Sequence, residues 1–244
     1  MRTSWAALTI ALGLVLAGCA STSTTNSQLQ TDPDDPLEGW NRQVFDMNQR
    51  FDEAIMKPTA EAYIAVVPEP ARKGVHNFLT NLNSPVVFAN DLLQGEVGLA
   101  GETVGRFGLN TTIGLGGLVD VATPAGIPGH SSDFGQTLGV WGVGEDPYLV
   151  LPLLGPSNPR DLAGYVADQA MSPLNYVGIR DYTYWSIGAG AVNIVDERAQ
   201  NMDTLNQLEQ TSLDPYASMR SLYRQYRRSH IRHGKSSVKD LPSM

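Results

Sequence analysis

The chain has 244 residues, a net charge of −8 at neutral pH and a single cysteine. Its length suits one domain or two small ones, and a hydrophobic content of 42% excludes a disordered acidic chain. The lone cysteine excludes an internal disulfide framework and CxxC chemistry, and the acidic balance argues against a nucleic-acid partner.

Residues 1–18 have the features of a signal peptide. Arg2 precedes a mostly apolar run, Trp5 to Gly18, which as a helix reaches about 21 Å, short of the ~30 Å hydrocarbon core of a bilayer. The junction Leu16-Ala17-Gly18-Cys19 is typical of a bacterial lipobox, and the alternative is an ordinary signal peptide with an unrelated cysteine. We predict that Cys19 is acylated, because the only cysteine of the chain lies at the position that a lipobox requires. Two or three acyl chains would then anchor the protein stably. Residues 19–34 are polar and are expected to form a flexible tether.

Amphipathic helices are predicted along most of the mature chain, which makes the fold mainly α. The first begins at Asp35-Pro36, carries apolar residues at helical spacing and ends or bends at Lys57-Pro58. The others are predicted from Ser84-Pro85 to Gly95, from Asn158-Pro159, from Asp181 to about Gln210, and from Asp214-Pro215. The apolar stripes are expected to be core packing. Tyr148 to Leu151 could be extended, but no set of partners is found that would build a sheet.

Glycine is concentrated in the middle of the chain, where residues 95–144 hold 14 of the 24 glycines. Val104 to Val121 is apolar, with Arg106 and Asp120 as its only charges. It is too short to span a membrane but could form a helix–turn–helix hairpin dipped into one leaflet. The alternative is a globular structure in which the glycines permit close backbone contacts.

Charge is also unevenly distributed. Residues 220–239 carry +7 and no acid, whereas residues 19–219 carry −15. The basic segment could lie on anionic headgroups or on an acidic partner, or it could be a solvated helix that frays into a tail.

Catalytic motifs are absent from the sequence. There is no GxSxG or HExxH motif, and the four histidines lack metal-ligand spacing, so no catalytic residue, metal site or cofactor is expected. Gly129 to Asp133 combines His, Ser and Asp, but it is interpreted as a polar turn.

A series of ordered blocks follows the lipobox along the chain. Among them are Asp35–Arg42, Arg106–Thr111, Gly114–Asp120, Asp133–Gly139, Arg160-Asp161 and Asp214–Tyr216. With the lipobox and these blocks, the sequence resembles the MlaA/VacJ family of outer-membrane lipoproteins from about residue 35 to residue 228.

The resemblance implies a ring-like bundle of amphipathic helices over residues 35–230, embedded in one leaflet, with a Gly-rich hairpin and a basic tail (231–244) expected to be disordered. It implies a non-enzymatic lipoprotein on the periplasmic face of the outer membrane, which removes mislocalised phospholipids from the outer leaflet. The implied partners are phospholipid, trimeric porins and the periplasmic carrier MlaC. An adaptor that stabilises porins without conducting lipid is the alternative.

The resemblance also locates two candidate sites. A lipid gate is expected in the hairpin, where glycine would permit movement. Its residues are Leu109, Asn110, Thr111, Ile113, Gly114, Leu115, Gly116, Gly117, Leu118 and Val119. Contacts to the carrier or to headgroups are expected from Arg220, Arg224, Arg227 and Arg228.

Overall fold

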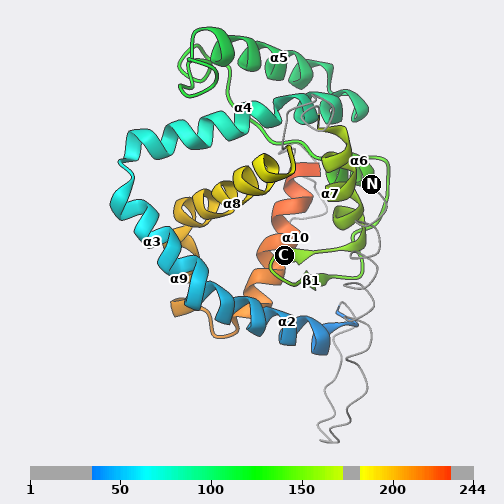
Figure 1. Cartoon of the computed structure of the whole chain (residues 1–244). Coiled ribbons are helices and arrows are strands. Elements are labelled where there is room, and N and C mark those ends of the chain that lie inside the picture. Colours follow the sequence, from blue (N-terminus) through cyan, green and yellow to red (C-terminus); the bar gives the residue numbers. More distant parts are fainter. Residues whose placement is uncertain (1–34, 173–181, 232–244) are drawn as a thin grey trace, which may run out of the picture. The chain divides into compact units, whose positions relative to one another are not determined.

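The computed structural model describes residues 35–172 and 182–231, which lie within one compact unit (Figure 1). The predicted signal peptide, the tether with Cys19 and the basic tail from residue 232 lie outside the described residues. The described part is mainly helical with one two-stranded sheet, so the prediction of a mainly α fold is confirmed.

Within the described residues, the helices from α2 to α5 and from α8 to α10 follow one another with short connections, an irregular segment separates α5 from α6, and the two-stranded sheet lies between α6 and α7. The helices are α2 (Glu38–Phe51), α3 (Lys57–Val66), α4 (Glu69–Leu93), α5 (Val97–Thr112), α6 (Phe134–Val140), α7 (Pro159–Met171), α8 (Tyr182–Gln200), α9 (Met202–Thr211) and α10 (Pro215–Ile231). A π-helical turn, η1 (Asp52–Met56), joins α2 to α3.

The sheet consists of two short antiparallel strands, β1 (Leu149–Leu151) and β2 (Gly155–Ser157). Leu149 lies opposite Ser157, and Leu151 lies opposite Gly155. The expectation that this extended segment has no pairing partner is therefore wrong. The tight turn is possible because Leu153 and Gly155 adopt φ angles of 63° and 77°.

One of the two prolines expected at a helix boundary lies at one, and the other does not. Pro58 lies in the first turn of α3, which begins at the predicted Lys57-Pro58 after the π-helical turn η1, although the chain stays helical from α2 through η1 into α3. Pro85 lies inside α4, which already begins at Glu69. The helix predicted from Asp181 to Gln210 is also interrupted, because Asn201 separates α8 from α9.

Other helix signals are confirmed. Asn158 caps α7, with its side chain accepting a hydrogen bond from the Asp161 N–H at 2.8 Å. Asp214 Oδ1 accepts from the Ala217 N–H at 3.1 Å at the start of α10. Gly95, at φ 78°, follows the end of α4 as a left-handed C-terminal residue.

Packing between the helices joins segments that are distant in the sequence. Figure 1 shows α5 beside α4, and α8 in contact with both α3 and α4. Helix α6 packs on α7, and α10 packs against α6 and β2. This arrangement brings α4, α7 and α8 around the cavities described below.

The polarity of the interior is unusual for a water-soluble domain. Within the described ranges, sixteen polar or charged residues are buried, against nine apolar ones. The small apolar core consists of Val44, Tyr148, Val150 and Tyr216, with Phe45 edge-on to Tyr216 at a ring distance of 5.7 Å.

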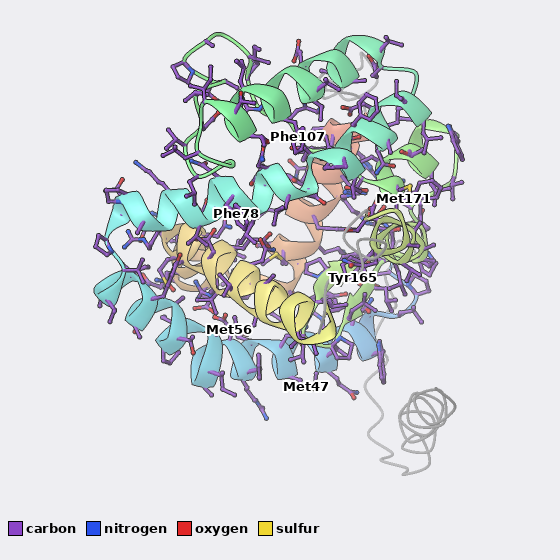
Figure 2. The ribbon with its side chains drawn as sticks, turned by 45° about the horizontal axis from the view of Figure 1, so that its top comes forward. Met47, Met56, Phe78, Phe107, Tyr165 and Met171 are labelled. Atoms are coloured by element: carbon purple, nitrogen blue, oxygen red, sulfur yellow. The ribbon has the colours of Figure 1, made fainter. Side chains whose placement is uncertain are left out.

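Much of the apolar surface points outward. Trp40, Met47 and Ile55 on the predicted stripe are 45%, 45% and 50% exposed, so the expectation that this stripe packs in the core is wrong for most of its length. Figure 2 labels two exposed side chains, Met47 on α2 and Tyr165 on α7. The stripe of α7 likewise leaves Tyr165 and Val166 exposed.

The inward face of α2 is polar where it meets β1. The amide of Asn41 accepts from the Val150 N–H at 2.9 Å and donates to the Tyr148 carbonyl at 3.0 Å. Two turns further along α2, the amide of Asn48 accepts from the Leu153 N–H and donates to the Leu151 carbonyl. These asparagines complete the backbone hydrogen bonds of the β1 edge, which explains why polar groups occupy the interior here.

Candidate functional site: polar cavities beside the glycine-rich loop

The predicted gate consists of the end of α5 and an irregular loop. Helix α5 stops at Thr112, and residues 113–121 form turns without a second helix, so the expected helix–turn–helix hairpin is wrong. The physical reason is local backbone geometry. Leu115, Gly116 and Gly117 have φ angles of 56°, 72° and 94°, which a right-handed helix does not accommodate.

Two of the loop glycines are required by close packing. A Cβ atom on Gly114 would lie 2.1 Å from the Val119 carbonyl oxygen, and one on Gly117 would lie 2.6 Å from the Asn81 Cβ. Gly116 differs, because a Cβ there would meet nothing within 4 Å. At Gly114 and Gly117 the structure therefore agrees with the alternative interpretation of this segment, in which glycines permit close contacts of the backbone in a globular structure.

A polar network ties this loop to α5. Asn110 is buried, and its Oδ1 accepts from the N–H groups of Val121 and Ala122 at 2.9 and 3.1 Å. Arg106 forms two hydrogen bonds of 3.1 Å to the carboxylate of Asp120. Burial alone would raise the pKa of Asp120, but hydrogen bonds from Thr123, Arg106 and Asn110 outweigh it and lower the pKa to about 2.

Contacts to α4 hold the same loop from the other side. Asn81 donates to the Thr111 hydroxyl at 3.0 Å, and Asn77 donates to the Leu118 carbonyl at 3.3 Å. The loop presents an apolar edge outward, formed by Ile113, Leu115, Leu118 and Val119, all of them exposed. The predicted gate residues thus divide into a polar base and an apolar rim.

Two adjoining cavities lie beside this polar base. The first, called here the polar cavity, has a volume of ≈ 530 Å³ and reaches Arg106 and Asn110 on α5, Asp120, and His230 on α10. The second, called the mixed cavity, has a volume of ≈ 490 Å³ and combines apolar residues such as Leu79 and Val87 with Asp168 and Glu197. The two cavities share His76, Thr80, His130 and Ser131 as lining residues.

Each of the shared histidines is held by a buried carboxylate. His76 Nδ1 lies 3.1 Å from an oxygen of Asp196, and His130 Nε2 lies 3.0 Å from an oxygen of Asp91. Asp91 also accepts from the Thr103 hydroxyl at 2.8 Å. Because both aspartates are almost completely buried, they fix the ring orientations at the cavity walls.

The cavity residues could not be found from sequence motifs. His76 and His130 are 54 positions apart, and only the packing of the 129–132 segment against α4 and α5 brings them together. A weak signal existed in composition, since three of the four histidines of the chain line the polar cavity. Within residues 35–172 and 182–231, no group of three or more His, Cys, Asp or Glu is arranged to hold a metal ion.

The arginines of α10 are engaged with acids from the rest of the fold. Arg227 is buried and forms hydrogen bonds of 2.7 Å to Asp133 and 3.0 Å to Asp161. Although burial alone would raise the pKa of both carboxyl groups, their arginine and hydrogen-bonding partners lower it below the usual range. Arg227 therefore joins α10 to the starts of α6 and α7, with most of its side chain buried.

The other three arginines form ion pairs nearer the surface. Arg220 lies 2.9 Å from the buried Asp35, so the residue at the predicted start of the first helix binds α10. Arg224 pairs with Asp146 at 3.0 Å, and Arg228 pairs with Glu145. Part of the charge imbalance along the sequence is thus resolved by pairing in the fold.

Comparisons with known proteins place this arrangement in context. The family model described as MlaA lipoprotein matches residues 33–230. The intermembrane phospholipid transport system lipoprotein MlaA of Escherichia coli (strain K12) is 38% identical over 221 residues, which cover 88% of this chain and 84% of the relative. The lipoprotein of the same name from Haemophilus influenzae is 33% identical over 249 residues, covering 99% of this chain and 97% of the relative.

A solved structure shows that the similarity extends to the fold. The structure described as "Structural basis for maintenance of bacterial outer membrane lipid asymmetry" superposes with a TM-score of 0.72 at 38% sequence identity. The match covers 81% of this chain and 98% of that one.

Proposed function

This chain belongs to the MlaA lipoprotein family, and we propose that it removes mislocalised phospholipids from the outer leaflet of the outer membrane. The lipids pass through the protein to a soluble periplasmic carrier, and the result is maintenance of lipid asymmetry. The transport role is supported by the phospholipid transport lipoproteins to which the chain is similar. The inward direction of transport rests on the family resemblance.

Location in one leaflet is supported by the distribution of polarity. Exposed apolar side chains lie on α2, α5, α7 and α8, among them Trp40, Val104, Val166 and Ile187. Apolar patches of this kind mark surfaces that contact lipid or other proteins. In the described ranges, no helix is both long and apolar enough to cross a bilayer. We propose that these outward faces lie among acyl chains of the inner leaflet, with acylated Cys19 as the anchor on the periplasmic side.

The single observation that carries the transport proposal is the pair of adjoining cavities. A phospholipid needs polar groups around its headgroup and apolar contact for its chains, and the mixed cavity offers both types of lining. The polar cavity reaches Asn110 and Asp120, which hold the loop with the apolar rim. We propose that this loop is the gate, with the rim as its lipid-facing part. The protein then acts by binding and release, without catalysis.

Two protein partners belong to this proposal on the strength of the family resemblance: trimeric porins and the carrier MlaC. Among the four arginines considered for carrier or headgroup contact, Arg228 has the most accessible side chain, with 53% exposed. We therefore place the carrier contact near the end of α10, with Arg220 and Arg224 as secondary candidates and without the buried Arg227.

A reconstituted system tests transport separately from porin stabilisation. The full protein, with its porin, is placed in vesicles that contain a labelled phospholipid, and transfer to the purified carrier is measured. We expect faster transfer than from vesicles with the porin alone. If the protein leaves transfer unchanged while still binding and stabilising the porin, the adaptor alternative is correct.

A further inference from the structure

The mixed cavity has a distinctly acidic lining. Its charged residues are Asp168 and Glu197, and none of the described residues that line it is an arginine or lysine. Behind the lining, the carboxylates of Asp91 and Asp196 face His130 and His76. The potential inside this cavity therefore favours a positively charged group.

The carboxylate of Asp168 forms part of the acidic lining of the mixed cavity. Its carboxylate accepts hydrogen bonds from the Asn90 amide at 2.8 Å and the Phe134 N–H at 3.0 Å, but it forms no ion pair with any residue in the described ranges. Burial raises the pKa of Asp168, because the charged form loses hydration that the hydrogen bonds from Phe134 and Asn90 and the charge of Arg227 do not fully replace. A ligand cation in the cavity would offset this cost.

The neighbouring polar cavity combines one balanced ion pair with neutral hydrogen-bond donors. There the positive charge of Arg106 is balanced by Asp120, and the walls carry donors from Asn77, Thr80 and Ser131. Hydroxyl and amide donors of this kind hydrogen-bond to phosphate oxygens. Because the two cavities adjoin, a ligand could place a phosphate in one and an ammonium group in the other.

We infer that the two cavities together bind the headgroup of a zwitterionic phospholipid, with the ammonium group beside Asp168 and Glu197 and the phosphate in the polar cavity. This inference rests on the proposed transport function and adds a headgroup preference to it. An anionic phospholipid without an ammonium group leaves both acids of the mixed cavity uncompensated, so it binds less tightly.

The test uses full-length protein in detergent and calorimetric titration with short-chain lipids. Dihexanoyl phosphatidylethanolamine is compared with its N-acetylated form, which has the same chains and phosphate but no cation. We expect the amine-bearing lipid to bind roughly fivefold more tightly, the upper range for a partly exposed ion pair. Glu197→Gln should reduce this ratio, since it keeps the hydrogen bond with Asn193 but removes the charge.

Glu53→Gln is the matched control, because Glu53 is an exposed acid on η1 that lines neither cavity. This variant should keep the wild-type ratio. Equal affinities for the two lipids, or an unchanged ratio in Glu197→Gln, would overturn the inference and leave the transport proposal standing. Glycerophosphoethanolamine binding as tightly as the lipid would also overturn it, in favour of a free headgroup. Failure to bind either lipid would remove the transport proposal together with the inference.

Discussion

Replacing Asn110 by alanine tests how the glycine-rich loop is held in place. The change removes the acceptor for the N–H groups of Val121 and Ala122, at 2.9 and 3.1 Å, and the donor to Asp120 at 3.2 Å. Each buried N–H left without a partner costs about 1–3 kcal/mol. The higher helix propensity of alanine returns about 0.5 kcal/mol. We therefore expect a net loss of about 1.5–5.5 kcal/mol in the free energy of unfolding.

Asn77→Ala is the matched control for this experiment. Asn77 contacts the same loop, but through a single hydrogen bond of 3.3 Å in a partly exposed position. Its loss should change the free energy of unfolding by less than about 0.5 kcal/mol, given the compensating helix propensity. Chemical denaturation of both full-length variants in the same detergent measures the difference. Equal stabilities for Asn110→Ala and the wild type would refute the view that Asn110 fixes the loop.

Three further predictions concern packing, charge and membrane contact. Gly117→Ala should lower the melting temperature more than Gly116→Ala, because both have positive φ but only Gly117 faces a Cβ clash; equal shifts would contradict this. Arg227→Met should cost about 3–5 kcal/mol at neutral pH, because Asp133 loses its ion-pair partner and Asp161 keeps only Arg160 at 2.9 Å. The pKa values of Asp133 and Asp161 are lower in the folded state than in the unfolded state, so wild-type stability should fall as the pH drops below about 4. The variant should lose less stability over this pH range, as measured by denaturation at several pH values. Met47→Glu should weaken sedimentation with phospholipid vesicles, whereas Gln43→Glu on an already polar exposed position should not.

The glycine-rich segment shows where sequence reasoning succeeded and where it stopped. Composition identified the segment as unusual, and the structure places its base at the wall of the polar cavity. Sequence alone could not separate glycines needed for movement from those needed for packing. Gly114 and Gly117 are fixed by close contacts, so replacing all the loop glycines by bulky residues would disturb packing as well as any gate. Gly116 is the position where a side chain meets open space, although its φ stays unfavourable for one.

Amphipathic periodicity located α2 but misjudged the direction of its apolar side. The spacing of Trp40 and Met47 is helical as expected, and both residues are exposed, while Asn41 is buried against β1. Periodicity reports that two faces differ, but only the surroundings decide which one is inside. The pairing of Arg227 with Asp133 was equally inaccessible, because the two residues are separated by 94 positions.

The most direct test of the account measures phospholipid in the outer leaflet of intact cells. The gene is deleted, and the full-length protein is restored from a second copy at its normal level. The account predicts that deletion raises surface-exposed phospholipid and that the restored protein returns it to the original level. Surface phospholipid that stays unchanged after deletion would contradict the central claim.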